Sequence, residues 1–255
     1  MGRIIAICNQ KGGVGKTTTA ISLSGCFSKL NYSILLVDMD PQGNATRGMG
    51  LDPTSIRKNI FDVLALNADI NKVIKKTQIK GVDVLPSNLK LATLESVISS
   101  NEKPFNLLKE AFNQMSRNYD FIIIDCPPSL GLLSLNALCA ADSVIIPVQC
   151  EYYAMEAVAQ ILSSISKIQR DYNPDLEILG FLLTMYDSRI KLATEVTTEI
   201  RGLFSEKTFV TQIPRNISLA EAAFYGKPIN IFRPKATGSI AYTSLAKEIL
   251  QNGKA

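Results

Sequence analysis

The sequence predicts an α/β fold, in which a mostly parallel, twisted sheet is flanked by helices on both faces. Short apolar runs rich in β-branched residues alternate with stretches of helical periodicity along the whole chain. A glycine-rich loop follows the first apolar run, and aspartates end two of the later runs. At 255 residues the chain can bury one large core, so we expect a single domain over residues 1–255.

The expected strands are the apolar runs of this alternation. The first helix is indicated by Ala20, Leu23, Phe27 and Leu30, which recur at helical spacing. Helices are expected between most of the strands, which we place at residues 3–8, 33–38, 82–85, 120–125, 143–148, 178–184 and 208–212.

Residues 11–18 read KGGVGKTT and predict a phosphate-binding loop. In the pattern G-x-x-x-x-G-K-[ST], backbone N–H groups surround the phosphates, the lysine reaches them, and the hydroxyl binds Mg²⁺. Gln10 replaces the first glycine, but Gly12 and Gly13 can still adopt the positive φ angles of an anion-binding turn. A strand before the loop and a helix after it favour a nucleotide site of the P-loop type over a plain glycine turn. The nucleotide-binding residues predicted here are Lys11, Gly12, Gly13, Val14, Gly15, Lys16, Thr17 and Thr18.

Two further strands end in aspartates. Residues 33–37 lead into Asp38 and Asp40, and residues 121–124 lead into Asp125. In open α/β sheets ligands bind at the carboxyl ends of the strands, which is where the phosphate loop also lies. We expect the Thr17 hydroxyl to ligate Mg²⁺, Asp125 to hold it through water, and Asp40 to orient an attacking water. A lone aspartate after a strand is more often a helix cap or turn residue. Here the phosphate loop and two strand ends with aspartates are expected at the same edge of the sheet, which favours a nucleotide site over isolated caps or turns.

Composition excludes several classes of chemistry. The chain has no histidine, which removes imidazole bases and histidine metal sites. Its five cysteines form no C-x-x-C pair, so we expect buried, reduced thiols. No signal peptide and no apolar stretch of about 20 residues is present, which predicts a soluble, cytoplasmic protein.

Six segments together resemble the ParA/Soj group of partition ATPases, which carry a deviant Walker A loop. The match runs over essentially the whole chain, and the spacing of the six is more specific than any one of them. They are residues 11–18, 38–44, 125–129, 151–154, 184–189 and 213–216.

The resemblance implies roles for individual residues in ATP hydrolysis. Lys11 would reach across a face-to-face dimer to the partner's phosphates, whereas Lys16 and Thr17 would serve the nucleotide of their own subunit. Gly12 would lie at the dimer face. Asp40 would be the catalytic carboxylate, while Pro214 and Asn216 would contact the adenine side.

The resemblance also implies partners. It predicts a homodimer formed on ATP binding, non-specific binding to duplex DNA, and a ParB/Spo0J-type centromere-binding protein that stimulates slow hydrolysis. The protein would associate with the nucleoid and segregate chromosomes or plasmids. Larger plasmid relatives place a helix-turn-helix domain before the ATPase, but here the first expected strand begins at Arg3, so we expect no such domain.

Basic residues concentrate in the last part of the chain. Residues 1–180 hold 17 Lys/Arg and 17 Asp/Glu, whereas residues 181–255 hold 10 and 6. A patch of such cations would bind a phosphate backbone without reading sequence, although solvated helix faces are the plainer explanation. The patch would comprise the predicted DNA-binding residues Arg189, Arg215, Lys227 and Arg233, with Lys191, Arg201 and Lys235.

The chain departs from the family pattern in the same region. Many relatives carry arginine where this chain has Ser218, and an Ala-Pro-Ser stretch where it has Ala222, Ala223 and Phe224. These differences put the strength and footprint of DNA binding in question.

Three alternatives stay open. A MinD-like membrane ATPase acting in division-site placement would need a basic amphipathic C-terminal helix. Residues 239–251 instead carry a stripe of Ile240, Leu245, Ile249 and Leu250 with Lys247 as the one cation, which is typical of a core-packing helix. An iron–sulfur electron carrier would use Cys126 or Cys139. A metabolic ATP-dependent ligase of the dethiobiotin-synthetase type would need neither Lys11 nor the basic C-terminal portion.

The least regular stretch, residues 43–59, follows Asp40 directly. It is a candidate switch segment beside the γ-phosphate, and a plain surface connection is equally consistent with it.

Overall fold

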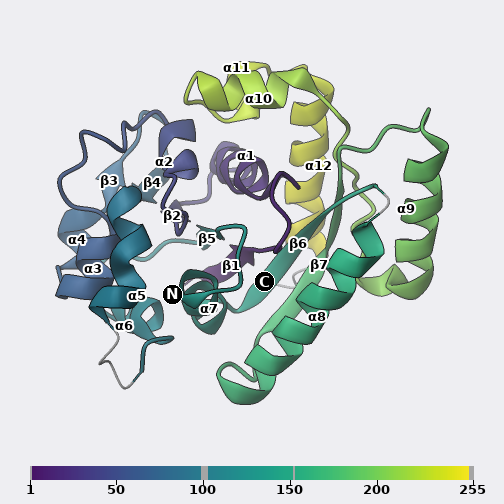
Figure 1. The fold of residues 1–255 in the computed structure, drawn as a ribbon. Coiled ribbons are helices and arrows are strands. Elements are labelled where there is room, and N and C mark those ends of the chain that lie inside the picture. The colour runs from purple at the N-terminus through teal and green to yellow at the C-terminus, as the bar shows by residue number, and fades with distance from the viewer. Residues whose placement is uncertain (1, 99–102, 152, 253–255) are drawn as a thin grey trace.

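A seven-stranded sheet runs through the centre of the computed structural model, which describes residues 2–98, 103–151 and 153–252 (Figure 1). Its strand order is β3-β4-β2-β5-β1-β6-β7. All neighbouring pairs are parallel except β3, which runs antiparallel to β4. The predicted mostly parallel α/β sheet is therefore confirmed. The strands are β1 (Arg3–Ile7), β2 (Ile34–Asp38), β3 (Lys75–Lys76), β4 (Val82–Leu85), β5 (Phe121–Asp125), β6 (Ser143–Gln149) and β7 (Glu177–Thr184).

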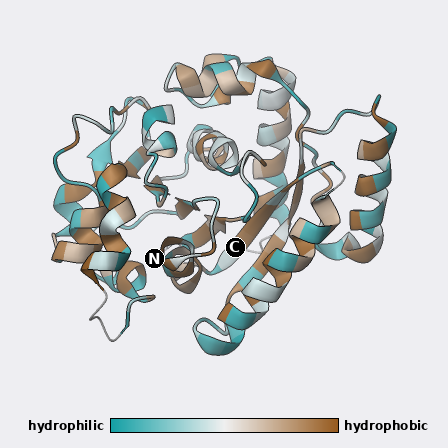
Figure 2. Ribbon diagram, in the orientation of Figure 1, coloured by the Kyte–Doolittle hydropathy of each residue, from teal (hydrophilic) through white to brown (hydrophobic). Residues whose placement is uncertain are grey.

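Helices cover both faces of the sheet because the side chains of each strand alternate between two apolar cores. In β1, Ile4 and Ala6 belong to one core, whereas Ile5 and Ile7 belong to the other. Figure 2 shows the strands as the apolar centre of the molecule.

The two cores divide the helices between them. The first core packs under α3 (Ile60–Leu66), α4 (Ile70–Val73), α5 (Leu94–Val97), α6 (Leu107–Asn113), α7 (Leu132–Ala140), α8 (Ala154–Asp171) and α9 (Lys191–Leu203). The second packs under α1 (Lys16–Lys29), α2 (Asn44–Gly48), α10 (Ile217–Phe224), α11 (Ile229–Phe232) and α12 (Thr237–Asn252). Two short 3₁₀ turns complete the described elements, η1 (Leu89–Thr93) and η2 (Ser205–Lys207).

Six of the seven expected strands are confirmed, with ends that differ by at most one residue, and the strand expected at 208–212 is wrong. In that segment Thr208 forms only an isolated bridge to Phe181. The reason lies in the next residues, because the N–H groups of Val210 and Thr211 donate to the carboxylate of Glu248 instead of to β7. The sequence analysis also missed β3, a two-residue edge strand of lysines without an apolar pattern.

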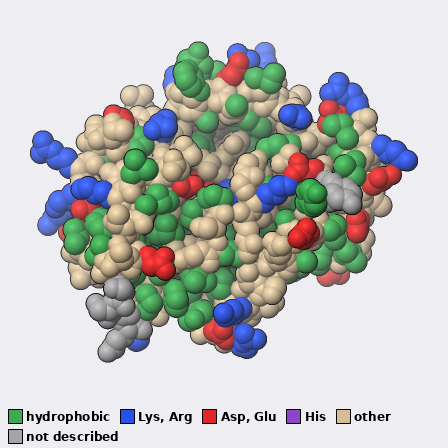
Figure 3. Space-filling view, viewed as in Figure 1, with side chains coloured by type: hydrophobic (Ala, Val, Ile, Leu, Met, Phe, Trp, Pro, Cys, Tyr) green, Lys and Arg blue, Asp and Glu red, His purple; other side chains and the backbone are tan. Residues whose placement is uncertain are grey.

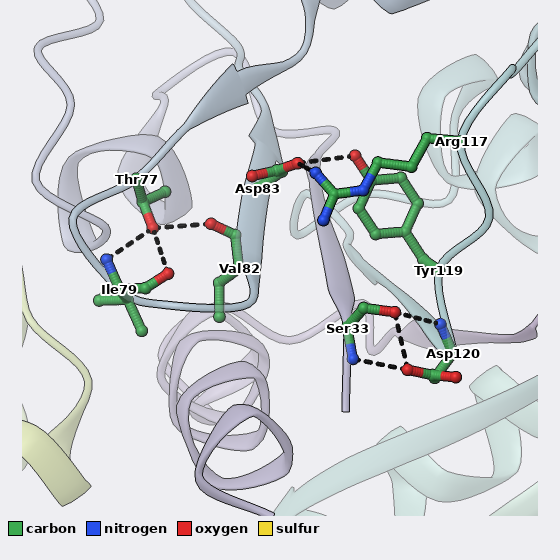
Figure 4. A network of polar contacts seen from close by, with 8 residues as sticks. All are labelled: Ser33, Thr77, Ile79, Val82, Asp83, Arg117, Tyr119 and Asp120. Carbon is green, nitrogen blue, oxygen red and sulfur yellow. Dashed lines mark hydrogen bonds and ion pairs between the residues drawn. The ribbon is translucent and has the colours of Figure 1, made fainter. Parts of the chain in front are cut away.

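Polar contacts hold the strands in place near their amino-terminal ends (Figure 4). Asp83 on β4 accepts a hydrogen bond from the Tyr119 hydroxyl (2.9 Å) and forms an ion pair with Arg117. The Asp120 carboxylate accepts from the backbone N–H (2.6 Å) and hydroxyl (2.7 Å) of Ser33. These contacts link β2, β4 and β5, so the carboxyl ends of the strands are aligned at the opposite edge.

The C-terminal helix packs as expected through Leu245 and Ile249, both fully buried. Ile240, which the sequence analysis placed on the same stripe, is 58% exposed, so that part of the prediction is wrong.

All five cysteines are free and buried, as expected. Within the described ranges, no helix combines the length and apolar character that crossing a membrane requires.

Candidate functional site

The loop between β1 and α1 has the backbone geometry of an anion-binding turn. Gly13 (φ 77°) and Gly15 (φ 94°) adopt left-handed conformations that favour glycine. Gly15 is also the N-cap of α1 and makes no side-chain cap, so the first N–H groups of the helix have no side-chain acceptor there. These donors and the helix dipole both favour a bound phosphate.

Buried side chains hold this loop. The Asn9 side chain donates to the carbonyl of Pro147 (2.7 Å) and accepts from the N–H of Lys11 (3.1 Å). The Thr184 hydroxyl, at the end of β7, donates to the carbonyl of Val14 (2.9 Å). The loop is thus tied to the carboxyl-terminal parts of β6 and β7 by hydrogen bonds.

A cavity of 380 Å³ opens over the loop. Its lining includes Asp40, together with six of the eight predicted loop residues, Gly12, Gly13, Gly15, Lys16, Thr17 and Thr18. Val14 points into the core, where it is buried, and Lys11 does not line this cavity. The structure therefore brings together most, and not all, of the predicted phosphate site.

The two lysines of the loop have different surroundings. Lys16 is buried, and its ammonium donates to the carbonyl of Lys11 (2.9 Å). Burial lowers the pKa of Lys16, and the nearby charge of Asp125 opposes that shift. Lys11 forms an ion pair with Glu151, which precedes α8. The sequence analysis gave Glu151 no role, because a contact between positions 140 residues apart leaves no local signal.

The aspartates at the ends of β2 and β5 lie side by side, since Asp38 and Asp125 are register partners. Both are fully buried. Asp38 accepts from the N–H and the hydroxyl of Thr46 (both 2.7 Å) and from the N–H of Asp40 (3.1 Å). Burial raises the pKa of Asp38 to about 6 despite these hydrogen bonds. Asp38 therefore binds Thr46 of α2 and holds the segment that carries Asp40, a role that was not predicted from the sequence.

Asp125 differs from its neighbour, because neither of its carboxylate oxygens accepts a hydrogen bond of good geometry among the described residues, although the Thr17 hydroxyl lies close by. Burial, followed by the charge of Asp38, raises the pKa of Asp125 well above its ordinary value, while Thr17 and Lys16 oppose that shift. An unpartnered buried carboxylate beside a threonine hydroxyl fits a hard divalent cation. The described residues contain no cluster of three His, Cys, Asp or Glu side chains, so phosphate oxygens and water would supply the remaining ligands.

A second, mostly apolar pocket of 240 Å³ adjoins the phosphate cavity. The two share Gly15, Thr18 and Met185, so they form one continuous site with a polar and an apolar part. Met185 adopts a left-handed conformation (φ 52°) that is unusual for its residue type. The apolar part suits a nucleotide base, and the sequence analysis had given no site role to Met185 or to Tyr242, which also lines it.

Pro214 and Asn216 both line the apolar pocket. The Asn216 side chain is occupied within the chain, because its oxygen accepts from the N–H of Ser218 (2.9 Å) and its amide donates to the Thr237 hydroxyl (2.6 Å). Asn216 therefore caps α10, and a base would meet its backbone and the apolar neighbours more readily than its amide.

Gly12 lies at an open surface. A Cβ atom added there would have its nearest neighbour, the Cβ of Pro128, at 4.0 Å. Nothing within the described chain therefore requires glycine at this position. A steric requirement would have to come from a ligand or a partner.

The predicted basic patch is only partly available. Arg189, in the turn before α9, forms a two-point ion pair with Asp187 (2.6 and 2.9 Å), and Arg233 pairs with Glu221 (3.2 Å). Arg215 and Lys227 are exposed. Figure 3 shows basic side chains spread over the face in view, with acidic side chains among them.

The three remaining cations of the expected patch also have neighbours within the chain. Lys191 pairs with Glu195 (3.5 Å), and Arg201 donates to the carbonyls of Phe209 (3.0 Å) and Val210 (3.1 Å). Lys235 lies in a groove with Arg233. The structure groups some of the predicted cations and does not bring all seven together in one groove.

The chain is similar in sequence to several known proteins. A family model described as an AAA domain matches residues 2–178. The sporulation initiation inhibitor protein Soj of Bacillus subtilis is 47% identical over 253 residues, covering 99% of this chain and 100% of that protein. The chromosome partitioning protein ParA of Myxococcus xanthus is 44% identical over 252 residues, covering 98% of this chain and 89% of that protein.

Solved structures with bound nucleotide share the fold. Cobyrinic acid a,c-diamide synthase from Mycobacterium smegmatis, with a bound ATP analogue and magnesium, superposes with a TM-score of 0.90 at 36% identity, covering 100% of this chain and 96% of that one. The septum site-determining protein MinD from Pyrococcus horikoshii, complexed with Mg-ADP, superposes with a TM-score of 0.80 at 27% identity and covers 100% of both chains.

Proposed function

The chain belongs to the ParA/Soj family of chromosome-partitioning ATPases, and we propose that it acts as an ATP-dependent dimerisation switch that binds DNA without sequence preference. The ATPase activity and the use of ATP and Mg²⁺ follow from the family. Residues 1–255 would work as one ATPase unit. The observation that carries the proposal is the pair of loop lysines, one directed at the phosphate cavity and one held away from it.

ATP would bind with its phosphates at the start of α1 and its base in the adjoining apolar pocket. The uncapped N–H groups of the first helical turn face the phosphates, and Lys16 would exchange its contact with the carbonyl of Lys11 for the β/γ-phosphates. Thr17 and Asp125 are the residues that would hold Mg²⁺, whose charge lowers the cost of the developing negative charge. Asp125 has the buried, unpartnered oxygens that such a role requires.

Asp40 would orient water at the γ-phosphate end. It lines the cavity with 9% of its surface exposed, and its Oδ1 atom accepts from the N–H of Gln42 (2.9 Å). The N–H of Asp40 is held in turn by Asp38. The carboxylate is thus fixed at the cavity wall, where it can accept a proton from water in line with the scissile bond.

Lys11 would complete the site of a second subunit. Within one chain its ammonium is paired with Glu151 and lies outside the cavity, so it would leave Glu151 to reach the opposite face of a dimer. Two subunits joined through Gly12 would each receive the other's lysine at the phosphates. Dimerisation would then depend on ATP, because only the triphosphate supplies charge at that position.

A mixing experiment tests this proposal. Lys11→Ala and Lys16→Ala subunits should each be inactive alone. In a mixed dimer, one site combines an intact Lys16 with the partner subunit's Lys11, so an equimolar mixture should recover a measurable part of wild-type ATP turnover. A mixture as inactive as its components would contradict the assignment of Lys11 to the opposite site.

In its ATP state the dimer would hold the nucleoid through its basic residues, and a ParB/Spo0J-type protein would stimulate hydrolysis and release. The basic surplus of residues 181–255 supports this part of the proposal, as do the names of the relatives. The location would be the cytoplasm, at the nucleoid.

One structural neighbour favours a second candidate, since cobyrinic acid a,c-diamide synthase is an amide-forming enzyme by its name. A metabolic ligase would hydrolyse ATP only with a small carboxylate substrate. Turnover stimulated by DNA and the partner protein, without any metabolite, would exclude it and would also separate this chain from a MinD-like ATPase that depends on a membrane.

A further inference from the structure

The outward side of α10 is apolar, whereas a solvent-facing helix is ordinarily polar. Ile217 and Phe224 are 80% and 82% exposed, and their spacing of seven residues places them on one side of the helix. The one charged residue of α10, Glu221, is engaged by Arg233. Phe224 therefore protrudes from the surface without cover from the described part of the chain, whereas Ile217 also borders the apolar pocket of the nucleotide site.

A row of aromatic rings extends from Phe224 to a guanidinium group. Phe224 and Tyr225 meet edge to face, with ring centres 5.4 Å apart, and Tyr225 stacks on Phe232 at 5.2 Å. The guanidinium carbon of Arg233 lies 5.3 Å from the centre of the Phe232 ring. We call Phe224, Tyr225 and Phe232 the aromatic ladder. The aromatic ladder therefore joins an apolar end of this surface, at Phe224, to a basic end, at Arg233.

The basic end has the chemistry of a phosphate site. Arg233 and Lys235 line a groove with Ser218 and Thr237, the first residue of α12, whose N-terminus adds positive charge. The Arg233 side chain is fixed by a hydrogen bond to the Ser218 hydroxyl (3.2 Å) as well as by Glu221. Lys227 is exposed in the turn after α10, between Tyr225 and Phe232 in sequence.

The occupant of this strip must offer negative charge and apolar surface together. A second copy of the same face does not, because it would bring the cations of Lys227, Arg233 and Lys235 against their equivalents. Duplex DNA offers both, since its backbone is anionic and its base pairs are flat and apolar. Protruding Phe and Ile side chains are used by DNA-binding proteins to enter between base steps.

We propose that the aromatic ladder is a DNA-contact surface, in which Phe224 inserts at a base step while Arg233, Lys235 and Lys227 hold the adjacent phosphates. The inference rests on the DNA binding proposed above and adds to it a contact that does not depend on charge. Salt would weaken the phosphate contacts and leave the ring contact unchanged. The ladder would also favour sites where unstacking is easy, such as a mismatch.

The test uses the Asp40→Ala protein with ATP and a random duplex that carries 2-aminopurine, a base whose fluorescence rises when it is unstacked. Phe224→Ser should weaken binding about tenfold at every salt concentration without changing the slope of log K against log salt. Lys227→Gln should instead reduce that slope by about 0.9. The fluorescence rise and the preference for a mismatched duplex should be lost in Phe224→Ser. Leu203→Ser is the matched control, because Leu203 is 63% exposed at the end of α9 and outside the ladder.

The outcomes separate the two proposals. If the Asp40→Ala parent protein binds DNA, and Phe224→Ser binds like Leu203→Ser with the same fluorescence, the ladder proposal is overturned and the DNA proposal stands. Loss of binding to anionic lipid vesicles, rather than DNA, in Phe224→Ser would assign the ladder to a membrane. If the parent binds no DNA at any salt concentration, both proposals fall.

Discussion

Replacing Asp125 by Asn should make the nucleotide-free protein more stable and the nucleotide-bound protein less so. Asp125 is fully buried, and neither of its oxygens accepts a hydrogen bond of good geometry in the described structure. A carboxylate in this position is costly until a cation binds it. Asparagine has the same shape without the charge, so it removes that cost and also removes the cation ligand.

The size of the effect follows from the two states of the side chain. A buried carboxylate that is compensated only in part, here by Lys16 and the Thr17 hydroxyl, still costs several kcal/mol, whereas an unpaired neutral amide costs about 1–3 kcal/mol. The nucleotide-free variant should therefore gain on the order of 2 kcal/mol at pH 8. Because the pKa of Asp125 is raised in the folded state, the wild type loses stability as pH rises from about 4, the ordinary value for Asp, towards the folded pKa. The advantage of Asn should accordingly shrink as the pH is lowered.

Urea denaturation between pH 5 and 8.5, with and without Mg-ATP, measures both effects. At 100 times its Kd, Mg-ATP should stabilise the wild type by about 2.7 kcal/mol and the variant by far less. Asp120→Asn is the matched control, because hydrogen bonds from Ser33 lower the pKa of Asp120 and the same change should destabilise the protein. An Asp125→Asn protein that is less stable without nucleotide, or that keeps the Mg²⁺-dependent stabilisation, would refute the reasoning.

Three further substitutions test other parts of the site. Lys16→Ala should abolish binding of a fluorescent ATP analogue while circular dichroism stays unchanged, and normal binding would remove Lys16 from the phosphate site. Gly12→Val should keep the fold of the single chain, as seen by circular dichroism, since the nearest atom lies 4.0 Å from an added Cβ, and should lose ATP-dependent dimers in analytical ultracentrifugation. Dimers of normal stability would show that Gly12 is not at the dimer face. Arg189→Glu should keep ATP-driven dimers and weaken DNA binding in a filter assay, because it reverses an exposed charge. Full DNA affinity would remove Arg189 from the DNA surface.

The fold could be predicted from sequence wherever one local pattern determined the structure. Buried parallel strands read as apolar runs, so β2 and β5 and the aspartates at their ends were found. The segment 208–212 contains the apolar Phe209 and Val210 and lies beside β7, yet the distant Glu248 takes two of its N–H groups. Such competition between positions far apart in sequence leaves no mark on the local pattern.

The residues of the candidate site likewise fall into those that a local sequence pattern predicts and those that it does not. The loop glycines, Lys16 and Asp40 follow from a motif and from the position of strand ends, and the structure places them around one cavity. Glu151 and Met185 were not predicted to take part, because their places depend on how β6 and β7 pack beside the loop. The roles assigned to these residues remain predictions for experiment.

Binding of the Asp40→Ala protein to a random-sequence duplex, across a salt series with ATP, ADP or no nucleotide, tests the central claim most directly. The substitution should trap the ATP state, so that hydrolysis does not enter the result. The account predicts binding in ATP alone, with log K falling against log salt by about 0.9 for each phosphate contact. Equal binding in all three nucleotide states, or no binding in any, would contradict an ATP-controlled DNA switch.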